Sequence, residues 1–210
     1  MKYLALFEES VTDAEKNPHA YACDVPAVKR LVSKLSKVLH PHHAEQGYKL
    51  VEQWNAFRGE RDIDQNVTHV EHNRAAIIMK AAEQVCKLKE PLTEFFKDED
   101  SSGIHQVINF DLTSTICGFE IAAVAYYFVG ITDPFWKLLH GTIENGVYVK
   151  KKVHILDLIP QLRSLKAFLE SLASDGLPLM EGETCFDEGF VEKDSFKLIQ
   201  DLTMADDRDK

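Results

Sequence analysis

Five of the nine histidines in this 210-residue chain are spaced in a way that could bind a metal ion. His40, His42 and His43 flank a proline, and His69 and His72 are three residues apart. If the second pair lies on a helix, both imidazoles share a face and can reach one ion. A histidine at the end of a second helix could supply a third nitrogen. The pattern predicts a site for zinc or another divalent metal, with surface or helix-end histidines as the competing interpretation.

Other catalytic patterns are absent from the sequence. It contains neither the His-Glu-x-x-His motif of zinc proteases nor the Glu-x-x-His pairs of di-iron bundles. It also lacks Gly-x-Ser-x-Gly, a Walker loop and Gly-x-Gly-x-x-Gly. The carboxylate pairs Asp98/Asp100 and Asp206/Asp207 lie in charged runs, where nothing raises a pKa for acid catalysis. We therefore predict no catalytic residue.

Charge and cysteine content restrict the partners and the redox environment. The formal net charge of −10 disfavours binding to a phosphate backbone. Two basic clusters, Lys29–Lys37 and Lys150–Lys152, are predicted to be solvated faces rather than nucleic-acid contacts. The cysteines show no Cys-x-x-Cys spacing and are predicted to be reduced and mostly buried. They are Cys23, Cys86, Cys117 and Cys185.

The elements that must position these residues are mainly helices. Apolar residues recur at helical spacing in most of the chain, which predicts an all-α, bundle-like fold. Asn145-Gly146 between apolar residues is typical of a small β-hairpin, placed near residues 143–153. The helices are expected at about 24–39, 44–57, 66–88, 91–96, the later half of 104–129 (ending at Gly130), 135–140 and 158–172.

Several aromatic residues allow two interpretations. Trp54, Phe135-Trp136 and Tyr126-Tyr127 could stack on nucleic-acid bases. All of them lie at apolar helical spacing, however, so we predict that they are core anchors. The tight sequence Cys117-Gly118 is likewise expected to be a packing point between helices.

The chain divides by charge into a helical domain, 1–176, and an acidic, loop-rich C-terminal tail, 177–210. From Glu181 to Lys210 there are ten acidic and four basic residues, a local charge of −6. The longest apolar stretch, Ile116–Ile131, is interrupted by Glu120 and is short for a membrane span. With no signal-peptide pattern, an intracellular protein in the cytoplasm or nucleus is expected.

The order of segments from Leu31 to Leu172 resembles the middle of hAT (hobo/Activator-type) transposases. Val67–Arg74 stands where that family has a Thr-Arg-Trp-Asn run, although the Trp and its preceding Arg are absent. Lys87–Leu92 follows, in the place of the family's Lys-x-x-Leu stretch. Ile159–Leu165 is similar to the family's Ile-Pro-x-Leu-x-x-Leu helix. The resemblance implies that this chain corresponds to the family's helical insertion region alone. The family's catalytic acids lie outside that region, so the likeness implies a transposase-derived interaction domain without catalytic residues.

Two functions therefore follow as alternatives. The first is a non-catalytic helical interaction or dimerisation domain, whose partner is another protein or a second copy. The second is a metal-binding helical enzyme or sensor built on the five histidines. Nucleic-acid binding by the Lys29–Lys37 face is a third interpretation, which the net charge disfavours, and no membrane partner is expected.

Overall fold

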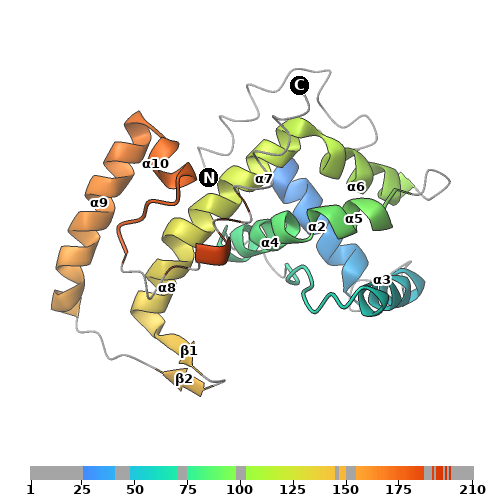
Figure 1. Cartoon of the computed structure of the whole chain (residues 1–210), viewed down its shortest axis with the longest axis horizontal. Coiled ribbons are helices and arrows are strands. Elements are labelled where there is room, and N and C mark those ends of the chain that lie inside the picture. Colours follow the sequence, from blue (N-terminus) through green and yellow to red (C-terminus); the bar gives the residue numbers. More distant parts are fainter. Residues whose placement is uncertain are drawn as a thin grey trace. The chain divides into compact units, whose positions relative to one another are not determined.

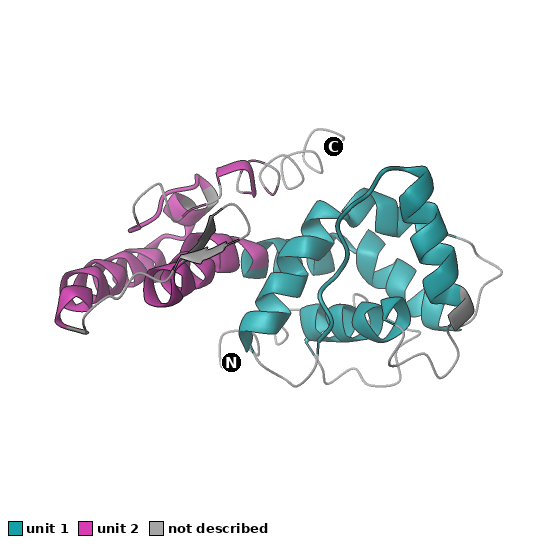
Figure 2. Cartoon of the chain, turned by 90° about the horizontal axis from the view of Figure 1, so that it is seen from below, with its two compact units in different colours: residues 1–124 teal, residues 125–210 magenta. Residues whose placement is uncertain are grey.

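A computed structural model describes residues 26–40, 48–70, 75–97, 103–144, 147–149 and 155–186, together with 191, 193–195, 197 and 199. Helices dominate these residues, which confirms the predicted all-α class (Figure 1). The chain forms two compact units, 1–124 and 125–210 (Figure 2). We describe each unit by itself. The predicted boundary at residue 176, between a helical domain and an acidic tail, stays a prediction.

Helix α2 (Ala27–Leu39) provides the central packing surface of unit 1. It begins after Pro26 and ends at His40, whose backbone is extended at φ −122° and ψ 133°. The next residue is Pro41, and a proline disfavours helical geometry in the residue before it. The end at Leu39 agrees with the sequence prediction, whereas the predicted start at residue 24 lies outside the described residues. One face of the helix is buried along its whole length, through Val28, Leu31, Val32, Leu35, Ser36, Val38 and Leu39.

Four further helices of unit 1 surround this core. α3 (Tyr48–Glu60), α4 (Ala75–Lys87) and α6 (Gly103–Thr113) each contact α2, and α5 (Lys89–Phe95) contacts α4 and α6. A single turn at Leu88 separates α4 from α5. Hydrophobic burial holds these elements together, because each presents an apolar stripe to the centre. The most deeply buried large side chains of α3 to α6 include Trp54, Val85, Leu92 and Ile108.

The predicted helix 66–88 is wrong in its first part. Residues 63–70 are neither helix nor strand, and α4 begins at Ala75. Residues 71–74 lie outside the described residues. Side chains of three helices bind the backbone of 63–70, as described below, and these bonds replace those of a helix. His69 therefore does not lie on a helix, and His72 lies outside the described residues.

The predicted helix end at Gly130 is also wrong. α7 (Thr115–Tyr127) continues through a π-helical turn, η3 (Phe128–Thr132), into α8 (Asp133–His140). In a regular helix the Gly130 carbonyl accepts a bond from residue 134, but Pro134 has no N–H to donate. The Thr184 hydroxyl donates to the Gly130 oxygen instead, at 3.0 Å. Pro134 thus explains the π turn. The Thr184 side chain supplies the hydrogen bond that the Gly130 carbonyl lacks within the helix.

The continuous helix Thr115–His140 is long and apolar enough, by length and composition, to cross a membrane. It is longer than the apolar stretch considered in the sequence, because the helix extends beyond Ile131. Half of its most apolar window is buried inside the protein, and core helices of soluble proteins pass the same test.

Unit 2 continues with short strands and a long helix. β1 (Thr142–Glu144) pairs antiparallel with β2 (Val147–Val149), with Ile143 opposite Tyr148. Residues 150–154 lie outside the described residues, so the extent of the expected hairpin over 143–153 stays a prediction. A 3₁₀ turn, η4 (Ile155–Asp157), leads into α9 (Leu158–Ser174), and α10 (Leu177–Met180) packs on α9.

Candidate functional site

Two of the five histidines predicted to bind metal come together in unit 1. The ring centroids of His40 and His69 are 4.9 Å apart, with the ring planes tilted by 52°. His42, His43 and His72 lie outside the described residues. Among the described residues, no three His, Cys, Asp or Glu side chains gather closely enough to hold a metal ion. What the structure brings together is therefore a pair of imidazoles from two distant segments.

Both rings of the pair form a hydrogen bond through a ring nitrogen. His40 Nε2 lies 2.6 Å from the Val67 carbonyl oxygen. Since a carbonyl only accepts, Nε2 carries the proton and donates it. His69 Nδ1 lies 3.2 Å from the Ser36 hydroxyl, which also accepts a bond from the Val70 N–H at 2.8 Å. These bonds fix the orientation of both rings against α2.

The backbone of the 63–70 segment is held by side chains of three helices. Arg58 of α3 donates to the carbonyl oxygens of Ile63 and Asp64, at 3.2 and 2.8 Å. Gln84 of α4 accepts the Thr68 N–H at 2.5 Å. Together with the bonds from Ser36 and His40 of the α2 end, these contacts satisfy backbone groups that have no helix or sheet partner. A non-helical segment is thereby fixed where it carries His69.

Trp54 adds a further anchor to this segment. Its indole N–H donates to Asn66 Oδ1 at 3.0 Å, and the same oxygen accepts the Val67 N–H at 2.9 Å. The Trp54 side chain is fully buried and stacks on Phe57, with Phe95 packed edge-on. The prediction that Trp54 is a core anchor is confirmed.

Ser36 and Arg30 are the important polar residues that the sequence interpretation missed. Ser36 interrupts the apolar stripe of α2 and is 2% exposed. Because buried polar groups are normally hydrogen-bonded, a serine within an apolar stripe indicates an internal hydrogen bond. Arg30 belongs to the Lys29–Lys37 cluster that was predicted to be solvated. Its side chain is in fact only 11% exposed and faces the interior of unit 1. The prediction of a solvated basic face is therefore wrong for Arg30.

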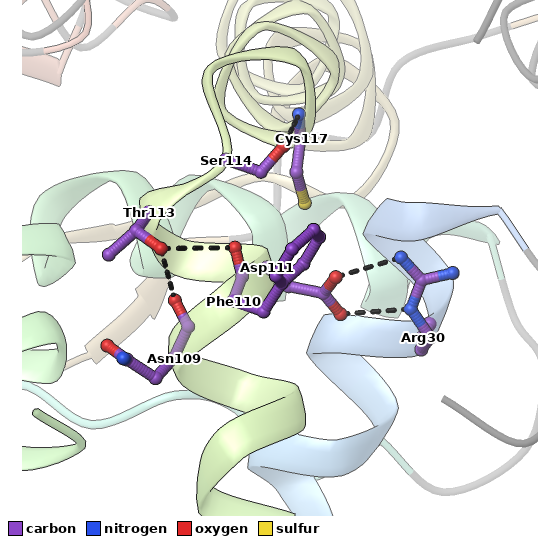
Figure 3. A network of polar contacts seen from close by, with 7 residues as sticks. All are labelled: Arg30, Asn109, Phe110, Asp111, Thr113, Ser114 and Cys117. Carbon is purple, nitrogen blue, oxygen red and sulfur yellow. Dashed lines mark hydrogen bonds and ion pairs between the residues drawn. The ribbon is translucent and has the colours of Figure 1, made fainter. Parts of the chain in front are cut away.

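Arg30 forms a two-bonded ion pair with Asp111 of α6 (Figure 3). Its Nε and Nη2 atoms lie 2.9 and 2.8 Å from the two carboxylate oxygens. Asp111 is 1% exposed, so the pair is shielded from water. Parallel bonds of this kind are the strongest arrangement of guanidinium and carboxylate. The pair fixes the position of α6 against α2.

Ser114 and Cys117 lie beside this ion pair, where α6 gives way to α7. The Ser114 hydroxyl accepts the Cys117 N–H at 3.4 Å, which caps the first turn of α7 (Figure 3). Cys117 is buried, as predicted for a packing point. Gly118 is not tightly packed, because a Cβ added there would meet only Lys89 Nζ at an ordinary 3.7 Å.

The cysteines within the described residues are free thiols, as predicted. Burial raises the pKa of Cys86 to about 12, with the charge of Glu83 acting in the same direction. Burial also raises the pKa of Cys117, reinforced by Asp111 and Glu120. Neither thiol forms a nucleophilic thiolate at neutral pH, so neither supports covalent catalysis. Cys185 is half-buried, and Cys23 lies outside the described residues.

Iodoacetamide is expected to alkylate Cys185 at least ten-fold faster than Cys86 and Cys117 in the folded Cys23→Ser chain. At pH 8 a thiol with a pKa of about 12 is a thiolate about one part in 10,000, and burial blocks the reagent as well. Mass spectrometry of tryptic peptides measures the rates, and full denaturation should make the three similar. The pKa of Cys86 in the folded chain lies above its ordinary value of 9.0. The contribution of this thiol to the free energy of unfolding is therefore fully present below pH 9 and is lost as the pH rises toward 12. Equal rates in the folded chain would contradict this burial.

The aromatic residues of unit 2 divide between core and surface. Tyr126 is buried, which confirms its predicted role as a core anchor. Tyr127 and Trp136 are 37% and 47% exposed, so the same prediction is wrong for them. Trp136 stacks on His140, one turn further along α8, at 4.7 Å between ring centroids. Trp136 and His140 therefore form an aromatic pair on an exposed face of α8, outside the core.

Helix α9 presents a partly exposed apolar face. The helix was predicted at residues 158–172 and forms at Leu158–Ser174, but none of its side chains is buried. Ile159 and Leu162 are 39% and 45% exposed. The other large apolar side chains of this face are half-buried, namely Leu158, Leu165, Phe168, Leu169 and Leu172. A second candidate site results, namely an amphipathic helix whose apolar side is available to a partner.

Comparison of this chain with protein-family models, curated proteins and solved structures gave no match.

Proposed function

We propose that this chain is a non-catalytic helical interaction protein that associates with a second copy of itself through α9. The observation that supports the proposal is the partly exposed leucine face of that helix. Leu162 is 45% exposed and the other leucines of the row are half-buried, with none of them fully buried. A row of large apolar side chains left in water is costly, and a partner surface lowers that cost.

The leucines of α9 have the spacing of a coiled-coil seam. Their separations are four, three, four and three residues, which matches two heptads with leucine at every a and d position. The residues are Leu158, Leu162, Leu165, Leu169 and Leu172. Such a row is complementary to an identical row, because each leucine fits between those of the opposite helix. This self-complementarity favours a second copy over an unrelated partner.

The charges beside the seam also favour self-association. Ile159 and Phe168 extend the apolar face on its two flanks. Lys166, the charged residue next to the seam, lies 3.6 Å from Glu170 of its own helix. Because this pair offsets the lysine charge locally, two copies can approach with little like-charge repulsion.

The short length of the seam sets the expected affinity. Seventeen residues of helix extend about 26 Å at about 1.5 Å each. Such a seam is at the small end of specific interfaces. We therefore expect a dissociation constant on the order of 10 μM.

Sedimentation velocity of the full chain between roughly 1 and 200 μM tests the proposal. We expect the mass to rise from monomer to dimer over this range. The variant with Leu162→Asp and Leu169→Asp should associate at least 100-fold more weakly, because dimerisation would bury four carboxylates. A control with Ser164→Asp and Ala167→Asp adds the same charge on the outer face and should dimerise like the unmodified chain.

Thermal unfolding of the aspartate variant at low concentration separates association from folding. Its melting temperature should stay within a few degrees of the unmodified chain, because these leucines are not buried in one copy. A chain that stays monomeric at the highest concentration would refute the proposal. So would an aspartate variant that dimerises as the control does.

We include a transposase-derived origin in this proposal. It is supported by the order of segments that resembles the hAT helical region, of which Ile159–Leu165 belongs to α9. The resemblance implies an interaction role without catalysis, which agrees with the role proposed from the leucine face.

A further inference from the structure

We propose that the solvent-facing side of α2 binds an acidic segment of a partner protein through Lys29, Lys34 and Lys37. Helix α2 carries four basic residues and no acidic residue, in a chain whose formal net charge is −10. The basic side chains are thus concentrated on one element instead of being dispersed among acids. Such segregation gives an acidic protein a locally positive surface. This surface belongs to unit 1 and is independent of α9 and of self-association.

The three lysines lie on the side of α2 opposite its buried stripe. Helical spacing places them within an arc of about 140° around the axis, away from the apolar residues. Lys37 is exposed, and Lys29 and Lys34 are half-buried. From Lys29 to Lys37 the row extends about 12 Å along the helix axis. A row of this length corresponds to about four residues of an extended peptide.

Within the residues that the structure describes, no carboxylate pairs with these three lysines. The ion pairs of unit 1 involve other cations. Two carboxylates are buried on the helices that pack against α2, and both are already paired, Asp111 with Arg30 and Glu83 with Lys87. The lysine charges are therefore available to an anion from outside the chain.

The position of Lys29 gives a second reason to expect an anionic partner. It lies in the first turn of α2, which contains no acidic residue and has no side-chain cap. The lysine charge and the positive end of the helix dipole repel each other there. A carboxylate bound beside Lys29 would interact favourably with both.

The length of the row and the charge of the whole chain favour an acidic peptide segment over nucleic acid. A DNA duplex carries one charge per about 1.7 Å and extends past a row of about 12 Å at both ends. Its remaining phosphates would face a chain of net charge −10. The charges of an acidic peptide segment can instead end where the lysine row ends.

The experiment is fluorescence anisotropy of a labelled octaglutamate peptide, titrated with the full chain at roughly 50 mM salt. We expect a dissociation constant on the order of 100 μM. Binding should weaken about three-fold or more at roughly 200 mM salt, because the charges are accessible to solvent. The triple variant Lys29→Gln, Lys34→Gln and Lys37→Gln should bind at least ten-fold more weakly. The corresponding triple arginine variant keeps the charges and should bind like the unmodified chain.

The matched control carries Lys80→Gln, Lys97→Gln and Lys197→Gln, which remove the same charge from exposed lysines elsewhere in the chain. This control should bind octaglutamate like the unmodified chain, and circular dichroism should show that every variant folds. Absence of octaglutamate binding by the unmodified chain would overturn the proposal. Equal weakening in the control would also overturn it, because net charge alone would then explain the effect. Tighter binding of a labelled DNA duplex through the same three lysines would assign the surface to nucleic acid instead.

Discussion

Replacing Asp111 with alanine is expected to lower the free energy of unfolding by about 3–5 kcal/mol. The substitution leaves the Arg30 guanidinium, 11% exposed, without the carboxylate to which its Nε and Nη2 donate. A buried charge that loses its partner keeps its desolvation cost and loses its attraction. Urea unfolding followed by circular dichroism measures the change, with the midpoint shifted to lower urea at similar slope.

The double variant Arg30→Met and Asp111→Leu tests whether the loss comes from the unpaired charge. Removing both charges and filling the space with apolar side chains should restore most of the stability lost in Asp111→Ala. Arg61→Ala is the matched control, because Arg61 and its partner Glu94 are 36% and 58% exposed. An exposed pair contributes about 0–1 kcal/mol. If Asp111→Ala costs no more than Arg61→Ala, the buried pair does not hold α6 on α2.

The sequence was sufficient to predict α2, because every local signal agrees there. The apolar residues recur at one face, and Pro41 ends the helix at His40. The same signals could not predict Arg30, since a basic residue beside lysines looks solvated. Its partner Asp111 is 81 positions away in sequence. An ion pair between residues far apart in sequence leaves no local pattern, so only the structure of the folded chain reveals it.

The 63–70 segment shows the opposite limit of sequence reasoning. Its apolar residues continue the periodicity of α4, so the sequence predicted a helix through His69. The competing bonds come from Ser36, Arg58 and Gln84, each on a different helix. His40 and His69 nevertheless lie in contact, which the hypothesis of a non-catalytic helical domain did not predict. The metal site itself stays a prediction.

Helix α9 was predicted well as a helix, but the partial exposure of its apolar face was not predicted. Periodicity shows which side chains share a helix face. It does not show whether that face packs into the interior of one chain or against a second copy. Leucine at every a and d position is compatible with both. Leu162 is 45% exposed, which the spacing alone could not indicate.

Replacing Trp54 with alanine is expected to lower the free energy of unfolding by about 3–5 kcal/mol. The side chain is fully buried, so its removal leaves a cavity among Phe57 and Phe95. It also removes the indole N–H that Asn66 accepts, and with it one anchor of the segment that carries His69. Thermal and urea unfolding measure the total loss.

Trp54→Phe separates packing from hydrogen bonding. Phenylalanine keeps an aromatic ring against Phe57 but cannot donate to Asn66, so we expect a smaller loss of about 1–2 kcal/mol. Trp136→Ala supplies the matched control, since Trp136 is 47% exposed and its removal opens no buried cavity. We expect that control to change stability by less than about 1 kcal/mol. Equal losses at Trp54 and Trp136 would show that the indole at position 54 does not organise unit 1, and that the 63–70 segment is held by its other contacts alone.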